Sequence, residues 1–250
     1  MVYLGSKQRI IKNILPYMLS DKYNTFVDLF CGGCSVIENV PKKYRRIAND
    51  KNFFLISMWK EFLAGNINAF NKITKEEYNY YNEKRKFAKP ELSIENALIG
   101  WVGFLASFRG KFFNGYAGAT NGRNYINEHI LNILQQKSRL DGVEFICEDY
   151  SNVEFNEKSI IYCDPPYKDT TGYCEEIDHN NFYKWVRQKI RGGHRVFISE
   201  YTAPADFRVI YQESINNSMN NTTATEKLFV HETQYNEIME EYLQKYPRLF

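Results

Sequence analysis

The sequence predicts an α/β fold with a mostly parallel sheet, and three features predict it. An apolar run of β-branched residues, Ser159–Cys163, is typical of a buried strand and stops at an acid followed by two prolines. A second apolar run, 25–29, leads through a glycine-rich turn into a helix start. A helical, aromatic and basic stretch lies between them. We therefore expect a sheet domain made of residues 1–62 and 144–250, with residues 63–143 inserted as a helical subdomain.

Composition bounds the class of protein. The chain has 250 residues, 44% hydrophobic and 25% charged, which predicts a globular protein with a substantial core. Its formal net charge of +2 neither demands nor excludes a nucleic-acid partner. No stretch approaches the ~20 apolar residues of a membrane span, so we expect a cytoplasmic protein without a membrane partner.

The five cysteines favour a reduced protein rather than a disulfide framework. They are Cys31, Cys34, Cys147, Cys163 and Cys174. The Cys31–Cys34 spacing suits half of a zinc site or a redox pair, but the second pair that zinc requires is missing from the sequence. His179 and His194 lack partner spacing and are expected at the surface. We expect no metal.

The acid and the prolines after the strand at 159–163 can grip a planar amine. Proline has no backbone N–H and a fixed φ, so Pro165 and Pro166 end the strand and leave carbonyls that can accept from a ligand. Asp164 then lies at the carboxyl end of a strand, where open α/β sheets bind ligands. Tyr167 adds an aromatic face. An adenine amino group can donate to Asp164 and Pro165 while its ring stacks on Tyr167.

Asp-Pro-Pro-Tyr after an apolar strand resembles the catalytic motif of amino-group methyltransferases, above all the DNA N6-adenine enzymes. The order of motifs resembles the α group of the Dam-type, D12-class enzymes. This resemblance implies an S-adenosylmethionine-dependent, Rossmann-like methyltransferase sheet with a reversed last strand and an inserted target-recognition subdomain. Asp164, Pro165, Pro166 and Tyr167 are its expected catalytic residues.

The turn after the strand at 25–29 is expected to hold the cofactor. Glycines let the backbone approach a ligand closely, and Asp50, at a strand end about 20 residues later, suits a ribose diol. The resemblance extends to the glycine motif FVDLFCGG, to an opening aromatic and lysine, and to an acid near residue 149, although Ser6 replaces a glycine. It implies S-adenosyl-L-methionine as cofactor and these contact residues: Tyr3, Lys7, Asp28, Phe30, Cys31, Gly32, Gly33, Asp50, Asp149, Tyr150 and Asp164.

The inserted segment mixes cations, glycines and aromatic residues. Cations meet phosphates, and aromatic rings can wedge or stack between bases. Beside a methyl-transfer site, this composition favours a surface for double-stranded DNA over an ordinary surface loop. The expected DNA-binding residues are Lys84, Arg85, Arg109, Lys111, Asn114, Tyr116 and Arg123.

These expectations combine into a site-specific DNA adenine methyltransferase that acts on an adenine flipped from the duplex. A phage or a restriction–modification system is the expected setting, with a cognate restriction endonuclease as a partner. Three alternatives stay open: cytosine N4 methylation, whose enzymes more often have serine at position 164; an RNA or protein amino-group methyltransferase; and a catalytically idle nucleic-acid-binding module on the same fold.

The remaining pattern predicts ordinary packing elements. Residues 207–211 and 226–230 are expected to form a terminal strand pair joined by the polar run 216–225. The other expected elements are helices at 9–19, 53–62, 179–190 and 236–246, and strands at 46–50, 142–150 and 195–201.

Overall fold

The computed structural model describes residues 1–67, 72–120, 122–166, 177–217 and 222–247. The chain divides into two compact units, and each is built from several segments. The first unit comprises Met1–Lys7, Cys31–Asn39 and Ala48–Tyr150. The second comprises Gln8–Phe30, Val40–Ile47 and Ser151–Phe250.

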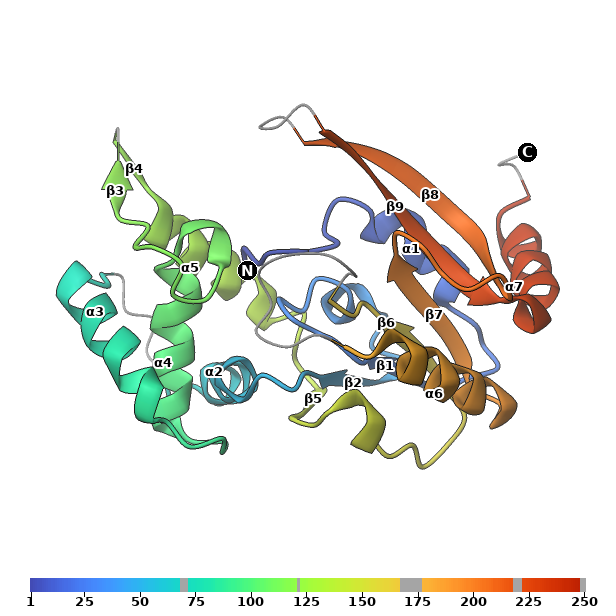
Figure 1. Cartoon of the computed structure of the whole chain (residues 1–250), viewed down its shortest axis with the longest axis horizontal. Coiled ribbons are helices and arrows are strands. Elements are labelled where there is room, and N and C mark those ends of the chain that lie inside the picture. Colours follow the sequence, from blue (N-terminus) through green and yellow to red (C-terminus); the bar gives the residue numbers. More distant parts are fainter. Residues whose placement is uncertain (68–71, 121, 167–176, 218–221, 248–250) are drawn as a thin grey trace. The chain divides into compact units, whose positions relative to one another are not determined.

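Seven strands form one mostly parallel sheet in the order β5-β2-β1-β6-β7-β9-β8 (Figure 1). Strands β1 and β6 are parallel, as are β6 and β7, whereas β9 runs antiparallel to both β7 and β8. The expected sheet with a reversed last strand is therefore confirmed. The strands are β1 Thr25–Asp28, β2 Arg45–Asn49, β5 Val143–Ile146, β6 Ser159–Cys163, β7 Arg195–Glu200, β8 Phe207–Asn217 and β9 Thr222–His231.

The centre of the second unit is formed by β1, β6 and β7, whose residues are all buried. Burial of every residue, rather than every second one, is what a parallel strand covered on both faces requires. The register pairs Asp28 with Tyr162. Because β1 and β6 are parallel and in this register, the acids Asp28 and Asp164 come at the same edge of the sheet.

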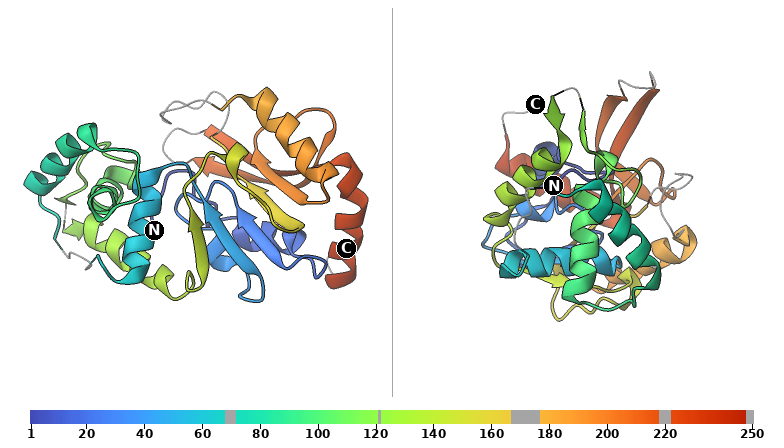
Figure 2. Two further views of the ribbon diagram at one scale, coloured as in Figure 1. Left: turned by 90° about the horizontal axis from the view of Figure 1, so that it is seen from below. Right: turned by 90° about the vertical axis from the view of Figure 1, so that its left-hand side faces the viewer.

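Three helices complete the second unit: α1 Ile11–Met18, α6 His179–Arg191 and α7 Glu232–Lys245. Helix α6 packs on β7, while α7 packs on α1, β8 and β9 (Figures 1 and 2). The side chain of Asp178 caps α6 by accepting from the backbone of Asn180 and Asn181, as predicted. Helix α7 begins four residues before the predicted start at 236.

The terminal strand pair is longer than the sequence predicts. The polar run 216–225 was expected to be a loop, but the ladder continues to the pair Asn217 and Thr222. Threonines at 222, 223 and 225 favour extended backbone because their Cβ is branched, and antiparallel pairing satisfies the backbone whatever the polarity of the side chain. The prediction of a joining loop over all ten residues was therefore wrong.

The first unit is mainly helical. Helix α4 packs against α2 and α3, and its core includes the buried side chains of Trp59, Phe62 and Trp101. Thr74 and Glu77 form a capping box at the start of α3, which fixes that end of the helix. The α-helices are α2 Phe53–Ala64, α3 Lys75–Lys84, α4 Ile94–Leu105 and α5 Tyr125–Lys137. The short elements are η1 Ile37–Asn39, η2 Arg85–Phe87, η3 Phe108–Gly110, η4 Tyr150–Asn152, β3 Ala119–Thr120 and β4 Arg123–Asn124.

Helices α3, α4 and α5 lie within the stretch 63–143 that the sequence analysis treats as an insertion. That stretch belongs to the first unit together with the glycine turn and the N-terminal segment. The insertion boundaries themselves stay a prediction. Within the described ranges, every helix is too short or too polar to cross a bilayer.

Candidate functional site

The carboxylate of Asp50 holds the glycine-rich turn of the first unit. Its Oδ2 accepts the backbone N–H of Gly32 at 3.1 Å, and its Oδ1 accepts the backbone N–H of Asn52 at 3.0 Å. Burial raises the pKa of this carboxyl, and the two backbone donors oppose that shift. The predicted ribose acid and the predicted glycine turn are therefore directly bonded.

Tyr3 packs on the same turn. A Cβ built on Gly32 would lie 2.6 Å from the Tyr3 ring, and one on Gly33 would lie 2.6 Å from the Tyr3 Cβ. Gly32 also has a φ of +45°, which disfavours a side chain. Cys34 adopts a φ of +61° and is fully buried. The turn thus accepts a thiol but leaves no room at either glycine.

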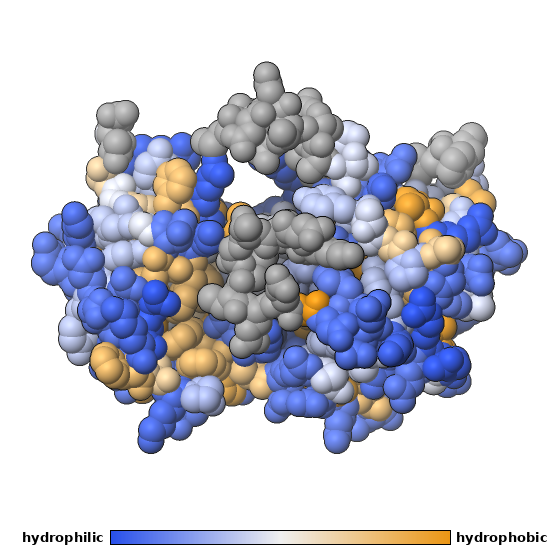
Figure 3. Space-filling view, viewed as in Figure 1, coloured by the Kyte–Doolittle hydropathy of each residue, from blue (hydrophilic) through white to orange (hydrophobic). Residues whose placement is uncertain are grey.

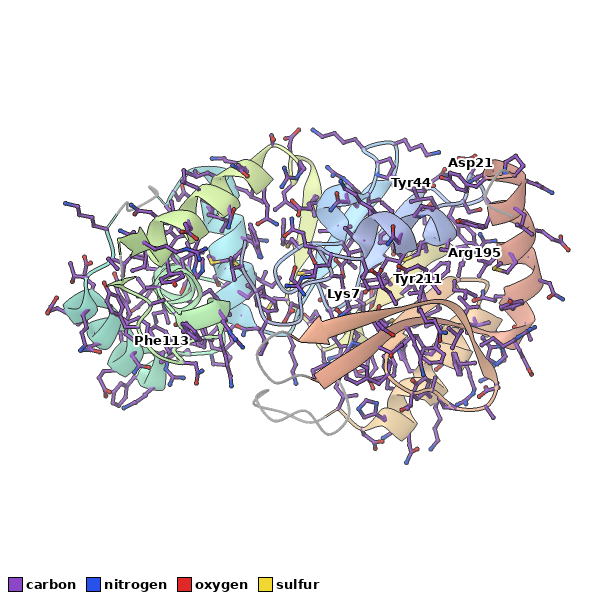
Figure 4. All side chains as sticks on the ribbon, turned by 90° about the horizontal axis from the view of Figure 1, so that it is seen from above. Lys7, Asp21, Tyr44, Phe113, Arg195 and Tyr211 are labelled. Carbon is purple, nitrogen blue, oxygen red and sulfur yellow. The ribbon has the colours of Figure 1, made fainter. Side chains whose placement is uncertain are left out.

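Lys7 is buried, with 4% of its surface exposed (Figure 4). Its Nζ donates to the Gly5 carbonyl at 3.2 Å, and its backbone N–H donates to the Ser35 hydroxyl at 3.1 Å. Gly5 takes a φ of +82°, while Ser6 is outside the left-handed region. Serine at this position, a departure from the family pattern, therefore needs no strained backbone.

The acid expected near residue 149 follows β5. Asn49 ties the end of β2 to this segment: its Nδ2 donates to the Glu148 carbonyl at 3.1 Å, and its Oδ1 accepts the Glu148 backbone N–H at 3.1 Å. Asp149 is exposed, and Tyr150 is half-buried at the start of η4. Because β5 ends at Ile146, strand alternation does not choose between Glu148 and Asp149.

The second unit carries the other predicted site residues. Asp28, at the end of β1, is buried. Phe30 is half-buried, and its ring meets Phe182 of α6 edge-on at 6.1 Å between centroids. The backbone N–H of Leu29 donates to the Tyr162 carbonyl at 2.9 Å, which continues the β1–β6 pairing beyond Asp28.

Asp164 follows β6 directly, as predicted. It is half-buried, Pro165 is buried and Pro166 is half-buried. Peptide bonds are trans throughout the described residues, those before the two prolines included. Tyr167 lies outside the described residues.

Cys163 is unsuited to nucleophilic attack. Its side chain is fully buried, and burial, with the charges of Asp28 and Asp164, holds its thiol pKa well above the ordinary value. Tyr162 behaves similarly: burial raises the pKa of its hydroxyl, which shares a 2.7 Å hydrogen bond with Ser199. The candidates for chemistry at this strand end are therefore the predicted ones, Asp164 and the proline carbonyls.

A protein-family model described as "D12 class N6 adenine-specific DNA methyltransferase" matches residues 3–238. The chain belongs to this family. The match includes the glycine turn, Asp50, the inserted segment and the Asp-Pro-Pro motif.

Two curated relatives agree with this assignment. Type II methyltransferase M.FokI of Planomicrobium okeanokoites is 27% identical over 212 residues, which cover 74% of this chain and 31% of that protein. Modification methylase StsI of Streptococcus sanguinis is 33% identical over 196 residues, covering 68% of this chain and 28% of that protein. The chain thus spans about three tenths of the length of either relative. Among solved structures, HI0767 from Haemophilus influenzae aligns over 89% of this chain and 88% of its own, at 8% identity and a TM-score of 0.33.

Several cations predicted to bind DNA in this D12-class chain form bonds within the first unit. Lys84 pairs with Glu95 at 2.6 Å. Arg123 pairs with Glu128 through two nitrogens, at 2.6 and 2.7 Å. These pairs are exposed, so solvent screens them and a phosphate can compete for the cation.

Arg85 has a more structural setting. Its Nε donates to Asn82 at 2.7 Å, and its guanidinium lies 5.3 Å from the ring centroid of Phe113 (Figure 4). Beside it, Phe87 is 85% exposed. On the face shown in Figure 3, apolar residues lie among hydrophilic ones on the side that carries α3 and α4.

The remaining predicted DNA residues lie on the loop after α4. Arg109 is exposed with a φ of +57°, Asn114 is exposed and Lys111 is half-buried. Tyr116 instead supports the fold, because its hydroxyl donates to the Ile73 carbonyl at 2.6 Å. The side chains of Arg109 and Asn114 are therefore exposed, whereas Tyr116 has an anchoring role.

Sequence reasoning missed three residues around these groups. Trp59 of α2 donates to the Gly32 carbonyl at 3.2 Å, and Gln136 of α5 donates to the Gly33 carbonyl at 3.1 Å. Tyr78 of α3 shares a hydrogen bond with Ser107 and accepts the backbone N–H of Gly115. The only signal in the sequence was a polar atom on an otherwise apolar helical face. The partner of the Trp59 indole is 27 positions away and that of the Gln136 amide is 103 positions away.

Two smaller expectations concern a histidine and the cysteines. His194 was expected at the surface, but it is buried, and its Nδ1 accepts the backbone N–H of Ser159 at 3.2 Å. The backbone N–H of Ser159, the first residue of β6, needs an acceptor, and the His194 imidazole supplies it. The four described cysteines are free thiols, and Cys174 lies outside the described residues. The described residues contain no cluster of three or more His, Cys, Asp or Glu suited to a metal.

Proposed function

We propose that this protein is a site-specific DNA adenine methyltransferase, which transfers the methyl group of S-adenosyl-L-methionine to N6 of an adenine flipped from duplex DNA. The observation that carries the proposal is the end of β6, where a half-buried carboxylate and two N–H-free prolines follow a fully buried strand. Membership in the D12 class supports adenine N6 as the acceptor.

The first unit has groups that suit the cofactor. Gly32 and Gly33 have no room for a Cβ, so backbone alone faces any ligand there, as a close approach requires. Asp50 presents a carboxylate held in place by two backbone amides, which fits a ribose diol. The proposed contacts of this unit are Tyr3, Lys7, Cys31, Gly32, Gly33, Asp50, Asp149 and Tyr150. Three further contacts predicted from the sequence, Asp28, Phe30 and Asp164, belong to the second unit. When bound, the cofactor supplies an electrophilic methyl group on a sulfonium.

The second unit is proposed to bind the acceptor base. The exocyclic amine of adenine has two hydrogens, and the Asp164 carboxylate and the Pro165 carbonyl each accept one. Both bonds strengthen as the nitrogen gains positive charge in the transition state, which is the condition for catalysis by charge stabilisation. The carboxylate then takes the surplus proton when the new C–N bond has formed. Tyr167 is proposed to stack on the base, and Pro166 to hold the turn rigid.

The inserted segment is proposed to contact the duplex. Phosphate contacts by Lys84, Arg85, Arg109, Lys111 and Arg123 would position the DNA, with Asn114 and Tyr116 beside them. Flipping is required because the amino group is unreachable inside the stack. The names of the relatives, a type II methyltransferase and a modification methylase, support a role in protecting DNA from a cognate restriction endonuclease.

The decisive experiment is methyl transfer from labelled S-adenosylmethionine to genomic DNA that lacks adenine methylation, followed by sequencing with modification detection. We expect N6-methyladenine in one short sequence motif. Asp164→Ala protein serves as the control and should leave the DNA unlabelled. Label in cytosine, RNA or protein, with adenine unmodified, would overturn the proposal.

A further inference from the structure

The glycine turn of the first unit is fixed by side chains that come from two helices. The indole Nε1 of Trp59 donates to the Gly32 carbonyl at 3.2 Å, and Nε2 of Gln136 donates to the Gly33 carbonyl at 3.1 Å. Both side chains are buried, with 0% and 1% of their surface exposed. Buried donors of this kind exchange little with water, so these bonds persist.

The direction of each donor is set by packing. The ring of Trp59 meets Phe62 edge-on at 6.4 Å between centroids and stacks on Phe145 at 6.3 Å. Gln136 lies in the last turn of α5, and its Oε1 accepts from the Met1 nitrogen. Neither side chain can turn away without breaking these contacts.

A fixed carbonyl also fixes the amide on the other side of the peptide bond. A trans peptide is planar, and its C=O and N–H point in opposite directions. Because the Gly32 carbonyl points to Trp59, the Gly33 N–H points away from Trp59. In the next peptide the Gly33 carbonyl points to Gln136, and the Cys34 N–H accordingly closes the turn on the Cys31 carbonyl at 2.7 Å. Asp50 already engages the Gly32 N–H.

We infer that Trp59 and Gln136 are positioning residues that aim the Gly33 N–H at the carboxylate of the cofactor's amino-acid part. This inference rests on the proposed function. Asp50 and Gln136 fix the peptides on either side, so the Gly33 amide is the donor of the turn that the cofactor engages. An oriented backbone N–H in a dry site binds an anion without the cost of reordering the loop.

The test measures binding, not turnover. S-Adenosylhomocysteine and 5′-methylthioadenosine share the nucleoside and the sulfur, but only the former has the amino-acid carboxylate. Trp59→Phe keeps a buried aromatic ring and removes the N–H. We expect the Kd for S-adenosylhomocysteine to rise about tenfold in calorimetry, the worth of one buried hydrogen bond, while the Kd for methylthioadenosine stays within about twofold.

Trp101 provides a matched control in the same unit. It is fully buried, it packs on the same Phe62 at 5.3 Å, and its Nε1 lacks a hydrogen-bond partner among the described residues. Trp101→Phe therefore deletes an N–H that bonds nothing, and both dissociation constants should match those of the unaltered protein. Gln136→Met is the second variant, with the same selective loss expected, should Trp59→Phe fail to fold.

The outcomes distinguish failure of this inference from failure of the proposed function. Unchanged binding of S-adenosylhomocysteine by folded Trp59→Phe and Gln136→Met proteins would overturn the inference. Equal weakening of both ligands would also overturn it, since general damage to the core has no preference for the carboxylate. If the unaltered protein binds neither ligand, the proposed function itself fails.

Discussion

The Asp50 Oδ2 atom accepts the backbone N–H of Gly32 at 3.1 Å. The residue directly after β2 therefore holds the turn that follows β1. Asp50→Asn removes one of two acceptors, because the amide nitrogen can only donate. We expect about tenfold or greater loss of affinity for S-adenosylhomocysteine, since hydrogen bonds to a charged group are worth about 1.5–3 kcal/mol. Calorimetry measures this, with exposed Asp21→Asn as the control. Equal affinity in both variants would contradict the role.

The pH dependence of Asp50 follows from its environment. Burial raises its pKa, so the folded protein binds this proton more tightly than the unfolded chain does. The stabilisation is fully present below the ordinary aspartate pKa of about 3.9 and is lost as pH rises through the raised value. We therefore expect the free energy of unfolding to fall over that interval in urea titrations at successive pH values. The Asp50→Asn protein should lack this fall in the free energy of unfolding with pH. If the fall is unchanged in the variant, another group causes it.

Asp164→Ala should abolish methyl transfer and leave cofactor affinity largely intact. The reason is that the carboxylate stabilises charge on the acceptor amine in the transition state, which the cofactor alone does not require. Single-turnover assays measure the first quantity and calorimetry the second. Asp164→Asn keeps the shape and should also be inactive. Turnover equal to the unaltered protein in either variant would remove Asp164 from the catalytic role.

The pair of Arg195 and Glu241 should dominate acid sensitivity in the second unit. Arg195 is 1% exposed, and its nitrogens reach the Glu241 carboxylate at 2.7 and 3.0 Å (Figure 4). The Arg195 guanidinium and nearby groups lower the pKa of Glu241 to about 2. The stabilisation is therefore present above the ordinary glutamate pKa of about 4.3 and is lost as pH falls toward 2.

Glu241→Gln should lower the free energy of unfolding at pH 7 by about 2 kcal/mol, because it leaves a buried guanidinium partly unpaired. The difference from the unaltered protein should shrink as pH approaches 2 in chemical denaturation. Glu237→Gln is the control: it also contacts Arg195, at 3.1 Å, but its side chain is 50% exposed. A larger effect at 237 than at 241 would refute this ranking.

The cations of the inserted segment should make DNA affinity depend on salt concentration. Arg109→Ala should weaken binding and reduce the slope of log K against log salt by about 1, the loss of one phosphate contact. Lys84→Ala should act less, because Lys84 must first leave Glu95. Glu95→Gln should accordingly strengthen binding. Fluorescence anisotropy over a salt series measures all three, and Lys43→Ala, in the second unit, is the control. Slopes that match the control would exclude the segment as the DNA surface.

Much of the fold could be predicted because its signals are local. The buried strands at 25–28 and 159–163, the capped helix at 179 and the acids at strand ends follow from hydrophobic runs, prolines and a capping aspartate. The motifs around Gly32 and Asp164 are equally local, so their positions at strand ends could be foreseen.

What escaped prediction depends on partners that are distant in sequence. The Trp59 indole and the Gln136 amide resemble ordinary helix residues until the turn they support is placed beside them. The exposed ion pairs of Lys84 with Glu95 and of Arg123 with Glu128 were also not foreseen, because paired and unpaired cations look alike in a sequence; both cations stay predicted DNA contacts. The strands at 207–217 and 222–231 are longer than their apolar segments, because backbone pairing extends the ladder through polar residues.

Tyr78 anchors the loop after α4 through Ser107 and the backbone of Gly115, and Tyr116 anchors it through the Ile73 carbonyl. Those anchors fix the path of the main chain, while side chains such as that of Asn114 are exposed. Substitutions there cost the fold little. On this proposed DNA surface, a lineage could therefore exchange these outward side chains one at a time, while the protein stays folded at every step.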